Sequence, residues 1–488
     1  MGSRVDAARA AARRSQPEAR STLDDWLRIR SVSGDPVHRV DVQRAAVLVA
    51  RLLRTMTPRV RTLPGPVVLA RIAGHGSRTA VVVYGHLDVR PAGPGWSTPP
   101  FRPTQVGRRL IARGASDDKG QLMAHLVALR AWQRVGGLPA DVVVIVDGAE
   151  EVGSPGLRAA LRQDGSLLAR PAGAVLVSDT RMVAPGRPSL TMSQRGALAL
   201  RVSVDVGGAP VHAGRFGGAV VDPSLVLAEI LRTSARAVSA TRPHAARALR
   251  PTDAEVRTAA GGRALLLDPA AGSTSRGALS VTGLRAGGTP GSVPTRARAD
   301  LDVRLPAGAR VEDVLAAVRA GVRRSRPRGV RVRVVPAHAV EGIRLEHPPQ
   351  IREAVRRACV AGFGQPPVVV SSGGSIPAIG VLRDLCGVSP VLLGLGPADD
   401  GAHGPDEHLD LDDWVRSIDT SVVLLGGLAS ASHLMDPDRP FSGRVERLRP
   451  SADFRRLENE TPEPCTPTAA GSGRPRGGSS PPSGGWQW

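Results

Sequence analysis

Short runs of consecutive apolar residues alternate along this chain with segments in which apolar residues recur at helical spacing. The runs have the length and composition of strands that are buried on both faces. The clearest runs cover residues 80–84, 142–146, 174–177 and 390–393. Between them, residues 42–56 and 120–135 carry apolar side chains about every 3.6 positions. We therefore expect an α/β fold with a mainly parallel sheet covered by helices.

The pattern changes between residues 197 and 336. Alternating segments such as 198–206 and 297–305 replace the apolar runs, and a helical segment covers 223–232. Because alternation predicts strands with one buried face, this region is expected to be an inserted α+β domain. The helical pattern resumes at residue 349, so the insertion interrupts the first domain. The expected α/β domain comprises 17–196 and 337–437, and the insertion comprises 197–336.

The two ends of the chain differ in composition from the rest. Residues 1–16 are rich in Ala and Arg, which predicts a flexible N-terminus. Residues 438–488 are rich in Pro, Gly, Ser and Arg, which predicts a disordered tail.

Polar residues follow each of the expected buried strands. In open α/β sheets, ligands bind just beyond the carboxyl ends of the strands, so these residues should converge at one edge. A group of unpaired buried carboxylates is unfavourable unless a cation offsets its charge. The sequence therefore predicts a metal site. The polar residues after the strands are His86, Asp88, Asp147, Glu150, Glu151, Asp179 and His403.

The ligand types indicate a hydrolytic site with two divalent metal ions. Histidines and carboxylates without a thiolate suit Zn, Mn or Co centres. Paired metals usually share a bridging carboxylate, and Asp117, just before the helix at residue 120, is the best candidate. The adjacent Glu150 and Glu151 can divide their roles, one binding metal and the other taking the proton of the attacking water. We expect a water nucleophile, because no Ser or Cys has a suitably placed base.

The formal net charge of +21 and the pI near 11.5 raise the possibility of nucleic-acid binding. The composition argues against it. Of 65 basic residues only Lys119 is lysine, the arginines are spread along the chain, and aromatic residues are 2% of the total. So few aromatics cannot form base-stacking platforms. We expect a solvated basic surface and no nucleic-acid partner.

The remaining composition bears on the compartment. No apolar run approaches the roughly 18 residues needed to span a bilayer, so no membrane association is expected. Three cysteines, Cys359, Cys386 and Cys465, lack CxxC spacing and indicate neither a disulfide framework nor a thiolate zinc site. A cytoplasmic location is expected.

Taken together, the motifs resemble those of the M20 metallopeptidases, a family of carnosinase-type dipeptidases, aminoacylases and desuccinylases. The resemblance covers roughly residues 20 to 435. Its order and spacing are highly specific. The matching segments are Gly85–Val89, Trp96 with Pro100–Phe101, Gly114–Gly120, Glu150–Glu151, Ser178–Asp179, His212–Gly214 with Gly217–Gly218, Gly373–Pro377, and His403 with Pro405–Glu407.

The resemblance implies a role for each residue of the metal site. His86 and Asp179 would hold the first metal, Asp117 would bridge, and Glu151 with His403 would hold the second. Zinc is the expected ion, with Mn or Co as alternatives. Beside these ligands, Glu150 would be the general base and acid, and Asp88 would fix the orientation of the His86 imidazole. The Asp117–Asp118 peptide is often cis in the family.

The insertion resembles the family's lid and dimerisation domain, which implies a homodimer. In this domain His212 is expected to reach the partner subunit's site and stabilise the oxyanion. Arg304 resembles an arginine that binds the substrate carboxylate, and the loop around Ser375 would bind the same group. Gly291 departs from the family pattern, because it stands near the place of a substrate-binding threonine.

The expected function is metal-dependent hydrolysis of the amide bond of small dipeptides. Asp179, where other branches carry Glu, favours dipeptidases or aminoacylases over carboxypeptidases. The alternative is an N-acyl amino acid amidohydrolase of the aminoacylase or desuccinylase type. A non-catalytic descendant that only binds metal or peptide is a further alternative, against which the intact Glu150 argues.

Overall fold

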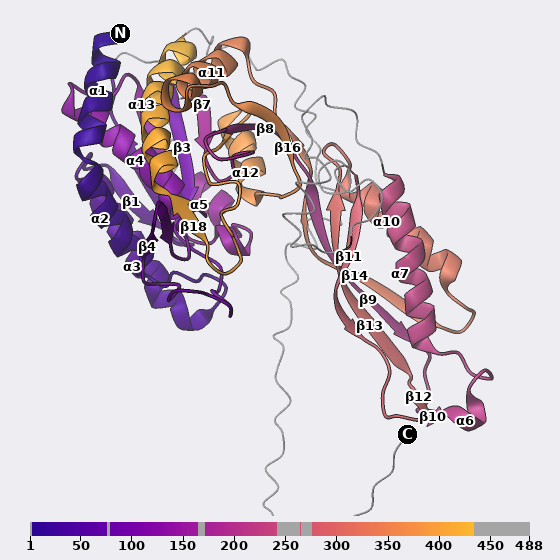
Figure 1. Cartoon of the computed structure of the whole chain (residues 1–488). Coiled ribbons are helices and arrows are strands. Elements are labelled where there is room, and N and C mark those ends of the chain that lie inside the picture. Colours follow the sequence, from indigo (N-terminus) through magenta and orange to yellow (C-terminus); the bar gives the residue numbers. More distant parts are fainter. Residues whose placement is uncertain (1, 76–78, 164–170, 242–263, 265–275, 434–488) are drawn as a thin grey trace, which may run out of the picture. The chain divides into compact units, whose positions relative to one another are not determined.

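The structure, a computed structural model, describes the chain except for residues 1, 76–78, 164–170, 242–263, 265–275 and 434–488 (Figure 1). The predicted disordered tail therefore lies outside the described residues. The largest sheet has nine strands in the order β1-β2-β6-β3-β7-β17-β8-β15, and β16 also pairs with β8. Its strands are β1 (Val60–Leu63), β2 (Val67–Ile72), β3 (Ala80–His86), β6 (Asp141–Asp147), β7 (Ala172–Val177), β8 (Ser189–Gln194), β15 (Ile343–Arg344), β16 (Val368–Ser372) and β17 (Val391–Gly394).

The four predicted apolar runs form the centre of this sheet. They are β6, β3, β7 and β17, which lie side by side and parallel. Every residue of β3 and β6 is buried, as expected for strands covered on both faces. The flanking pairs β1–β2, β2–β6, β8–β17 and β8–β15 are antiparallel. The predicted α/β class is thus confirmed, with a sheet that is mixed at its edges.

Helices cover both faces of the large sheet. Side chains that alternate along the central strands contribute to two separate cores, one on each face. One core includes α3, α4, α11 and α13, and the other includes α5 and α12. The helices around this sheet are α1 (Gly2–Arg14), α2 (Gln16–Leu27), α3 (Arg39–Arg54), α4 (Lys119–Arg134), α5 (Leu157–Gln163), α11 (Pro349–Phe363), α12 (Pro377–Cys386) and α13 (Leu411–His433). Among the described residues, no helix is long and apolar enough to cross a membrane.

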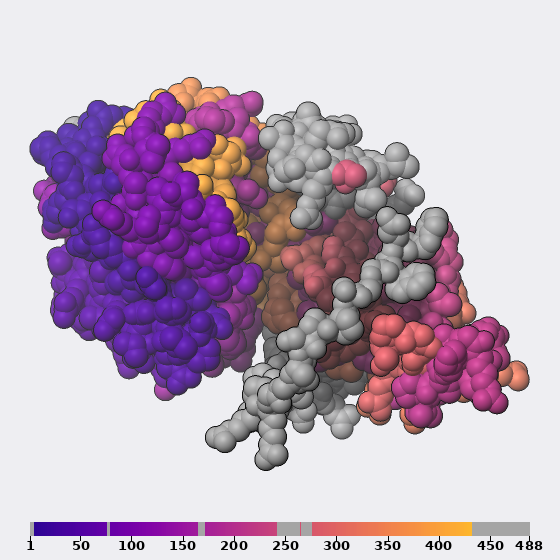
Figure 2. All heavy atoms as spheres, turned by 60° about the horizontal axis from the view of Figure 1, so that its bottom comes forward, coloured from indigo at the N-terminus to yellow at the C-terminus, as the bar shows by residue number. Residues whose placement is uncertain are grey.

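The N-terminal segment differs from the prediction. Residues 1–16 were expected to be flexible, whereas Gly2–Arg14 forms helix α1, which packs against α4 and α13. Ala8 and Ala12 are fully buried in this contact. Figure 2 shows atoms of the N-terminal helices, in indigo, at the surface beside α13, in yellow. The small Ala side chains permit close helix packing, although a segment of Ala and Arg contains few of the large apolar residues that usually indicate a buried helix face.

The predicted α+β insertion is confirmed as a second, smaller sheet. Four antiparallel strands have the order β11-β13-β9-β14, and α7 and α10 pack against them. Buried and less buried residues alternate along β9 and β13, as in strands with one covered face. The elements are β9 (Gly196–Asp205), α7 (Pro223–Ala240), β11 (Ala278–Arg285), β13 (Arg296–Leu305), α10 (Val311–Ser325) and β14 (Arg331–Val340).

Short elements carry several of the predicted site residues. The pair β10 and β12, followed by α6, lies in the insertion, and a three-stranded sheet joins residues near 105 to residues near 409. The short elements are η1 (Pro36–His38), β4 (Thr104–Val106), β5 (Arg109–Ile111), η2 (Glu150–Val152), β10 (Val211–His212), α6 (Ala213–Phe216), β12 (Ser292–Val293) and β18 (His408–Asp410).

Candidate metal centre

The carboxyl ends of neighbouring parallel strands carry the candidate ligands. His86 is the last residue of β3, and Asp179 follows β7 by two residues. Glu151 lies in η2, just after β6. Asp117 precedes α4, and His403 lies on the segment between β17 and β18. Because the parallel strands end at one edge of the sheet, residues far apart in sequence meet there.

Two groups of ligand atoms form at this edge. The donor atoms of His86, Asp117 and Asp179 lie within 4.8 Å of one another, and so do those of Asp117, Glu151 and His403. In the first group, His86 Nε2 lies 3.0 Å from Asp117 Oδ1 and 3.8 Å from Asp179 Oδ1. In the second, His403 Nε2 lies 3.1 Å from Asp117 Oδ2 and 3.2 Å from Glu151 Oε2.

Asp117 belongs to both groups and presents a different oxygen to each. Its Oδ1 faces His86 and its Oδ2 faces His403. This is the arrangement expected of a carboxylate that bridges two ions. The donor set of one imidazole and two carboxylate oxygens per group, without thiolate, also fits a divalent hydrolytic metal. The residues present therefore fit a pair of divalent ions.

The histidines counter the negative charge of the carboxylates. Burial by itself lowers the pKa of His86, but hydrogen bonds to Asp117, Asp179 and Asp88 raise it well above its ordinary value. Hydrogen bonds to Asp117 and Glu151 raise the pKa of His403 to about 10. A bound divalent cation would take over this charge compensation, because ligation requires a deprotonated imidazole nitrogen.

Glu150 lies beside the two groups without belonging to either. Burial, together with the charges of Asp179, Glu151 and Asp117, raises its pKa well above the ordinary value, against a lowering by His86. A carboxylate in such surroundings holds a proton more readily than one in water. Glu150 is therefore suited to proton transfer.

Asp88 connects the histidine loop to the two glutamates. Its Oδ1 and Oδ2 accept hydrogen bonds from the backbone N–H groups of Glu150 and Glu151, each at 3.1 Å. Ser33 Oγ donates to the same carboxylate at 2.5 Å. His86 Nδ1 lies 3.5 Å from Asp88 Oδ1 and 3.1 Å from the backbone oxygen of Asp88. Asp88 thus contacts both the imidazole and the segment that carries the glutamates.

Some residues around the site were not singled out from the sequence. Asp118, which is fully buried, accepts a hydrogen bond from the backbone N–H of His86 at 3.2 Å, and the Asp117–Asp118 peptide is cis. Arg90 Nε lies 3.0 Å from Glu151 Oε2. Asp118 lies inside the recognised segment Gly114–Gly120, although no role was predicted for its side chain, and Arg90 directly follows the segment Gly85–Val89.

The predicted substrate-binding residues come together in part. Arg304 Nη1 lies 3.5 Å from Ser375 Oγ, while its Nε and Nη2 donate to the two oxygens of Asp302 at 2.8 and 3.0 Å. Asp302, for which the sequence predicted no role, therefore occupies two donors of this guanidinium. His212, on β10 of the insertion, is exposed and belongs to neither group of ligand atoms. Gly291 has a φ of +78° and accepts a hydrogen bond from Ala213 at 2.7 Å.

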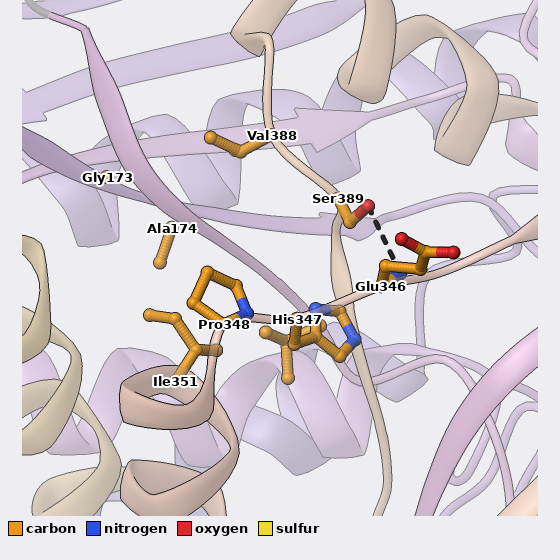
Figure 3. A pocket seen from close by; sticks show the side chains of 9 residues that line it. Gly173, Ala174, Glu346, His347, Pro348, Ile351, Val388 and Ser389 are labelled. Carbon is orange, nitrogen blue, oxygen red and sulfur yellow. Dashed lines mark hydrogen bonds between the residues drawn. The ribbon is translucent and has the colours of Figure 1, made fainter. Parts of the chain in front are cut away.

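A small pocket lies away from the candidate ligands, at the other end of β7 (Figure 3). In it the backbone N–H of Glu346 donates to Ser389 Oγ at 3.4 Å. Burial lowers the pKa of the neighbouring His347 to about 4. No predicted site residue lines it. The pocket is lined by Gly173, Ala174, Glu346, His347, Pro348, Ile351, Val388, Ser389 and Val391.

Comparison with known proteins shows the family of the chain. Residues 82–425 match the model of peptidase family M20/M25/M40. The chain belongs to this family. Among curated M20-type relatives, the Cys-Gly metallodipeptidase dug1 of Schizosaccharomyces pombe is 27% identical over 75% of this chain and 83% of its own length. The human Beta-Ala-His dipeptidase is 26% identical over 81% of this chain and 87% of its own length.

Solved structures share the fold. The dipeptidase Dug1p of Saccharomyces cerevisiae superimposes with a TM-score of 0.74 at 23% identity, covering 87% of this chain and 98% of its own. The YXEP protein of Bacillus subtilis, described as a dinuclear metal binding peptidase from the M20 family, gives a TM-score of 0.56 at 13% identity, covering 85% and 98%. These structures show the fold, and the match of residues 82–425 to the family model confirms the M20 assignment made from motifs.

Proposed function

We propose that this protein hydrolyses the amide bond of small dipeptides at a centre for two divalent metal ions. The observation that carries the proposal is the position of Asp117, whose two oxygens face the two histidine-containing groups, with Glu150 beside them. The relatives described above are named as dipeptidases, which favours dipeptides over the alternative N-acyl amino acids.

The ligands divide into two sets that share Asp117. His86 and Asp179 would complete the set for one ion, and Glu151 and His403 the set for the other. Zinc suits these ligands best, and Mn or Co would also be accommodated. When bound, such ions polarise the substrate carbonyl and lower the pKa of water.

Glu150 moves the proton in this proposal. Its carboxylate takes a proton from the attacking water and returns it to the nitrogen of the leaving amine, so one residue serves as base and then as acid. The raised pKa of Glu150 supports this cycle, because a stronger base accepts the proton more readily. Asp88, through the N–H groups of Glu150 and Glu151, holds both side chains in place and contacts His86.

Arg304 and Ser375 would bind the carboxylate at the end of the substrate. With two guanidinium donors already on Asp302, Nη1 of Arg304 is the donor left for the substrate, and it lies 3.5 Å from Ser375 Oγ, which itself donates to the backbone oxygen of Arg195. Charge-assisted hydrogen bonds of this kind are stronger than neutral ones. A free carboxylate on the substrate is therefore expected to matter for binding.

The insertion would act as a lid and as the contact of a homodimer. Exposed apolar side chains gather in sequence just after His212, which is itself exposed. Such residues are typical of protein contacts. We infer that His212 donates to the oxyanion in the partner's site. The apolar residues are Phe216, Val220, Val221 and Leu225.

The cytoplasmic location inferred from cysteine usage stays a prediction.

The test is hydrolysis of a panel of dipeptides and N-acyl amino acids by protein reconstituted with Zn, Mn or Co. We expect free dipeptides to be cleaved faster than their N-acylated analogues. Amidation of the dipeptide's terminal carboxylate should raise KM and lower kcat/KM. Preference for N-acyl amino acids would replace the proposed substrate by the alternative. Absence of hydrolysis with all three metals, in protein that binds them, would overturn the proposed activity.

A further inference from the structure

The Glu407 side chain collects four hydrogen bonds beneath the candidate metal centre. It is fully buried, and its Oε1 accepts from the backbone N–H groups of Ser116 and Asp117 at 3.0 and 2.9 Å. Its Oε2 accepts from the N–H of Gly114 at 3.0 Å and from Arg113 Nη1 at 2.6 Å. Glu407 therefore fixes the backbone of the segment that carries Asp117.

Arg113, the partner of Glu407, reaches two other segments. Its side chain is 1% exposed. Its Nη2 donates to the backbone oxygen of Gly404 at 3.0 Å, next to His403, and to that of Pro91 at 3.3 Å, on the segment that follows Asp88. The guanidinium also stacks on Trp96 at 5.2 Å from the ring centroid.

We propose that the buried pair Arg113–Glu407 is a positioning unit for the second metal ion. It holds Asp117 through backbone N–H groups and His403 through Gly404, so it sets the distance between two of the three ligands of that ion. This inference rests on the ligand set of the proposed function. Neither residue bonds to His86 or Asp179, so the first ion should depend on the pair only through Asp117.

The conformation of His403 explains why such support is needed. His403 has a φ of +63°, in the left-handed region that a non-glycine residue rarely occupies. Residues in this region persist only where the surrounding structure holds them. The bond from Arg113 to Gly404 and the anchoring of Glu407 restrain the segment just after His403.

Replacing Glu407 by Gln keeps the shape of the side chain and removes part of its acceptor capacity. An amide NH₂ would face either the N–H groups of Ser116 and Asp117 or those of Gly114 and Arg113, so donors would meet donors. The buried guanidinium would also lose its anionic partner. The Asp117 segment should then shift, although no ligand has been changed.

The experiment is a calorimetric titration of metal-free protein with Zn²⁺. It compares wild type, Glu407→Gln and the milder Arg113→Lys. Wild type should bind two equivalents. Both variants should bind one of the two equivalents about 10- to 100-fold less tightly and the other with a smaller change, as is usual when a residue that orients ligands is altered. In the zinc-saturated variants kcat should fall while KM changes little, because Arg304 and Ser375, the proposed contacts of the substrate carboxylate, are unchanged.

Asp399→Asn is the matched control. Asp399 pairs with Arg109 at 2.7 Å on the segment that also carries His403, but both side chains are more than half exposed. Its loss should leave both zinc affinities unchanged. Unaltered zinc binding by Glu407→Gln and Arg113→Lys would overturn the positioning role while leaving the proposed function intact. Failure of wild type to bind two equivalents would overturn the metal centre and this inference with it.

Discussion

Two adjacent glutamates, Glu150 and Glu151, have different surroundings. Glu151 lies with Asp117 and His403 in one group of ligand atoms, whereas Glu150 is a buried carboxyl outside both groups. Glu150→Gln should lower kcat by about 10²- to 10⁴-fold, the usual size for a lost general base, with metal content unchanged. Glu151→Gln should lose both rate and one metal equivalent. Metal analysis of the purified variants checks this, and loss of metal in Glu150→Gln alone would reverse the two roles.

His125 contributes a pH dependence of stability that is separate from the site. It is fully buried on α4, and neither ring nitrogen has a hydrogen-bond partner within the described part of the chain. Burial lowers its pKa to about 4. The pKa of histidine in the unfolded state is about 6.5. At pH values between the two pKa values, the unfolded state binds a proton that the folded state does not. The free energy of unfolding should therefore fall as pH falls through this window.

His125→Leu measures this contribution. The difference in unfolding free energy between wild type and variant should change by about 3 kcal/mol from pH 7 to pH 4. The reason is that the variant lacks the one group whose pKa differs in this way between the folded and unfolded states. Chemical denaturation at several pH values provides the measurement. An equal pH dependence in wild type and His125→Leu would contradict the prediction.

Residue type and position were enough to predict which candidate ligands come together, but not the residues that support them. Three of the candidate ligands lie at or just after the ends of apolar strands, namely His86, Asp179 and Glu151. Parallel strands of one sheet end at the same edge, so these residues come together without further information about the fold. Glu407 is recognisable only when the backbone N–H groups of residues 114–117 point at it, and a sequence does not show where such groups point. Asp302 is different, because it stands two residues before Arg304 on one strand, a spacing that the sequence does show and that places both side chains on the same face.

At the level of elements, hydrophobic content determined which helices and strands could be predicted from the sequence. The central strands were predictable because consecutive Val, Ile and Leu residues have few other stable arrangements. Helix α1 was not, since its buried face consists of Ala residues such as Ala8 and Ala12. The antiparallel edge of the large sheet also went unforeseen. Strand direction there depends on chain connections that short, weakly patterned strands such as β1 and β15 do not specify.

Gly362 permits close packing of α11 on α13. A Cβ at Gly362 would lie 2.0 Å from Thr420 Oγ1 and 2.6 Å from the backbone oxygen of Arg416. Gly362→Ala should therefore lower the free energy of unfolding by about 1–3 kcal/mol through overpacking. Gly380 in α12 is the matched helical control, because a Cβ there would lie 3.6 Å from Ile343.

Gly380→Ala should be neutral or raise stability by up to about 1 kcal/mol, the ordinary gain of Ala over Gly in a helix. Urea denaturation of the two variants and wild type compares them directly. A loss of stability in Gly380→Ala as large as in Gly362→Ala would show that helix packing does not distinguish these positions.

For the molecule as a whole, the fold gathers a site from residues as distant in sequence as His86 and His403. This convergence follows from strand order, so the family motifs were informative about the fold and the candidate ligands together. Strand order does not explain how the insertion would take part in the reaction. His212 lies on β10, outside both ligand groups, and the proposal that it acts in the partner's site would need a second copy of the chain.

Subunit mixing tests that role. His212→Ala should lower kcat by about 10²- to 10³-fold, the usual effect of losing one oxyanion donor. If the histidine acts across a dimer, co-refolding this variant with Glu150→Gln at equal amounts should restore about a quarter of wild-type activity, since half the dimers would be mixed and each would hold one complete site. A mixture of Glu150→Gln with Glu151→Gln is the control, because both lesions lie in the same half of the site and no complete site can form. Recovery in the first mixture but not in the control supports action in trans. Native mass spectrometry establishes subunit exchange, and no recovery in exchanged dimers would place the action of His212 within its own subunit.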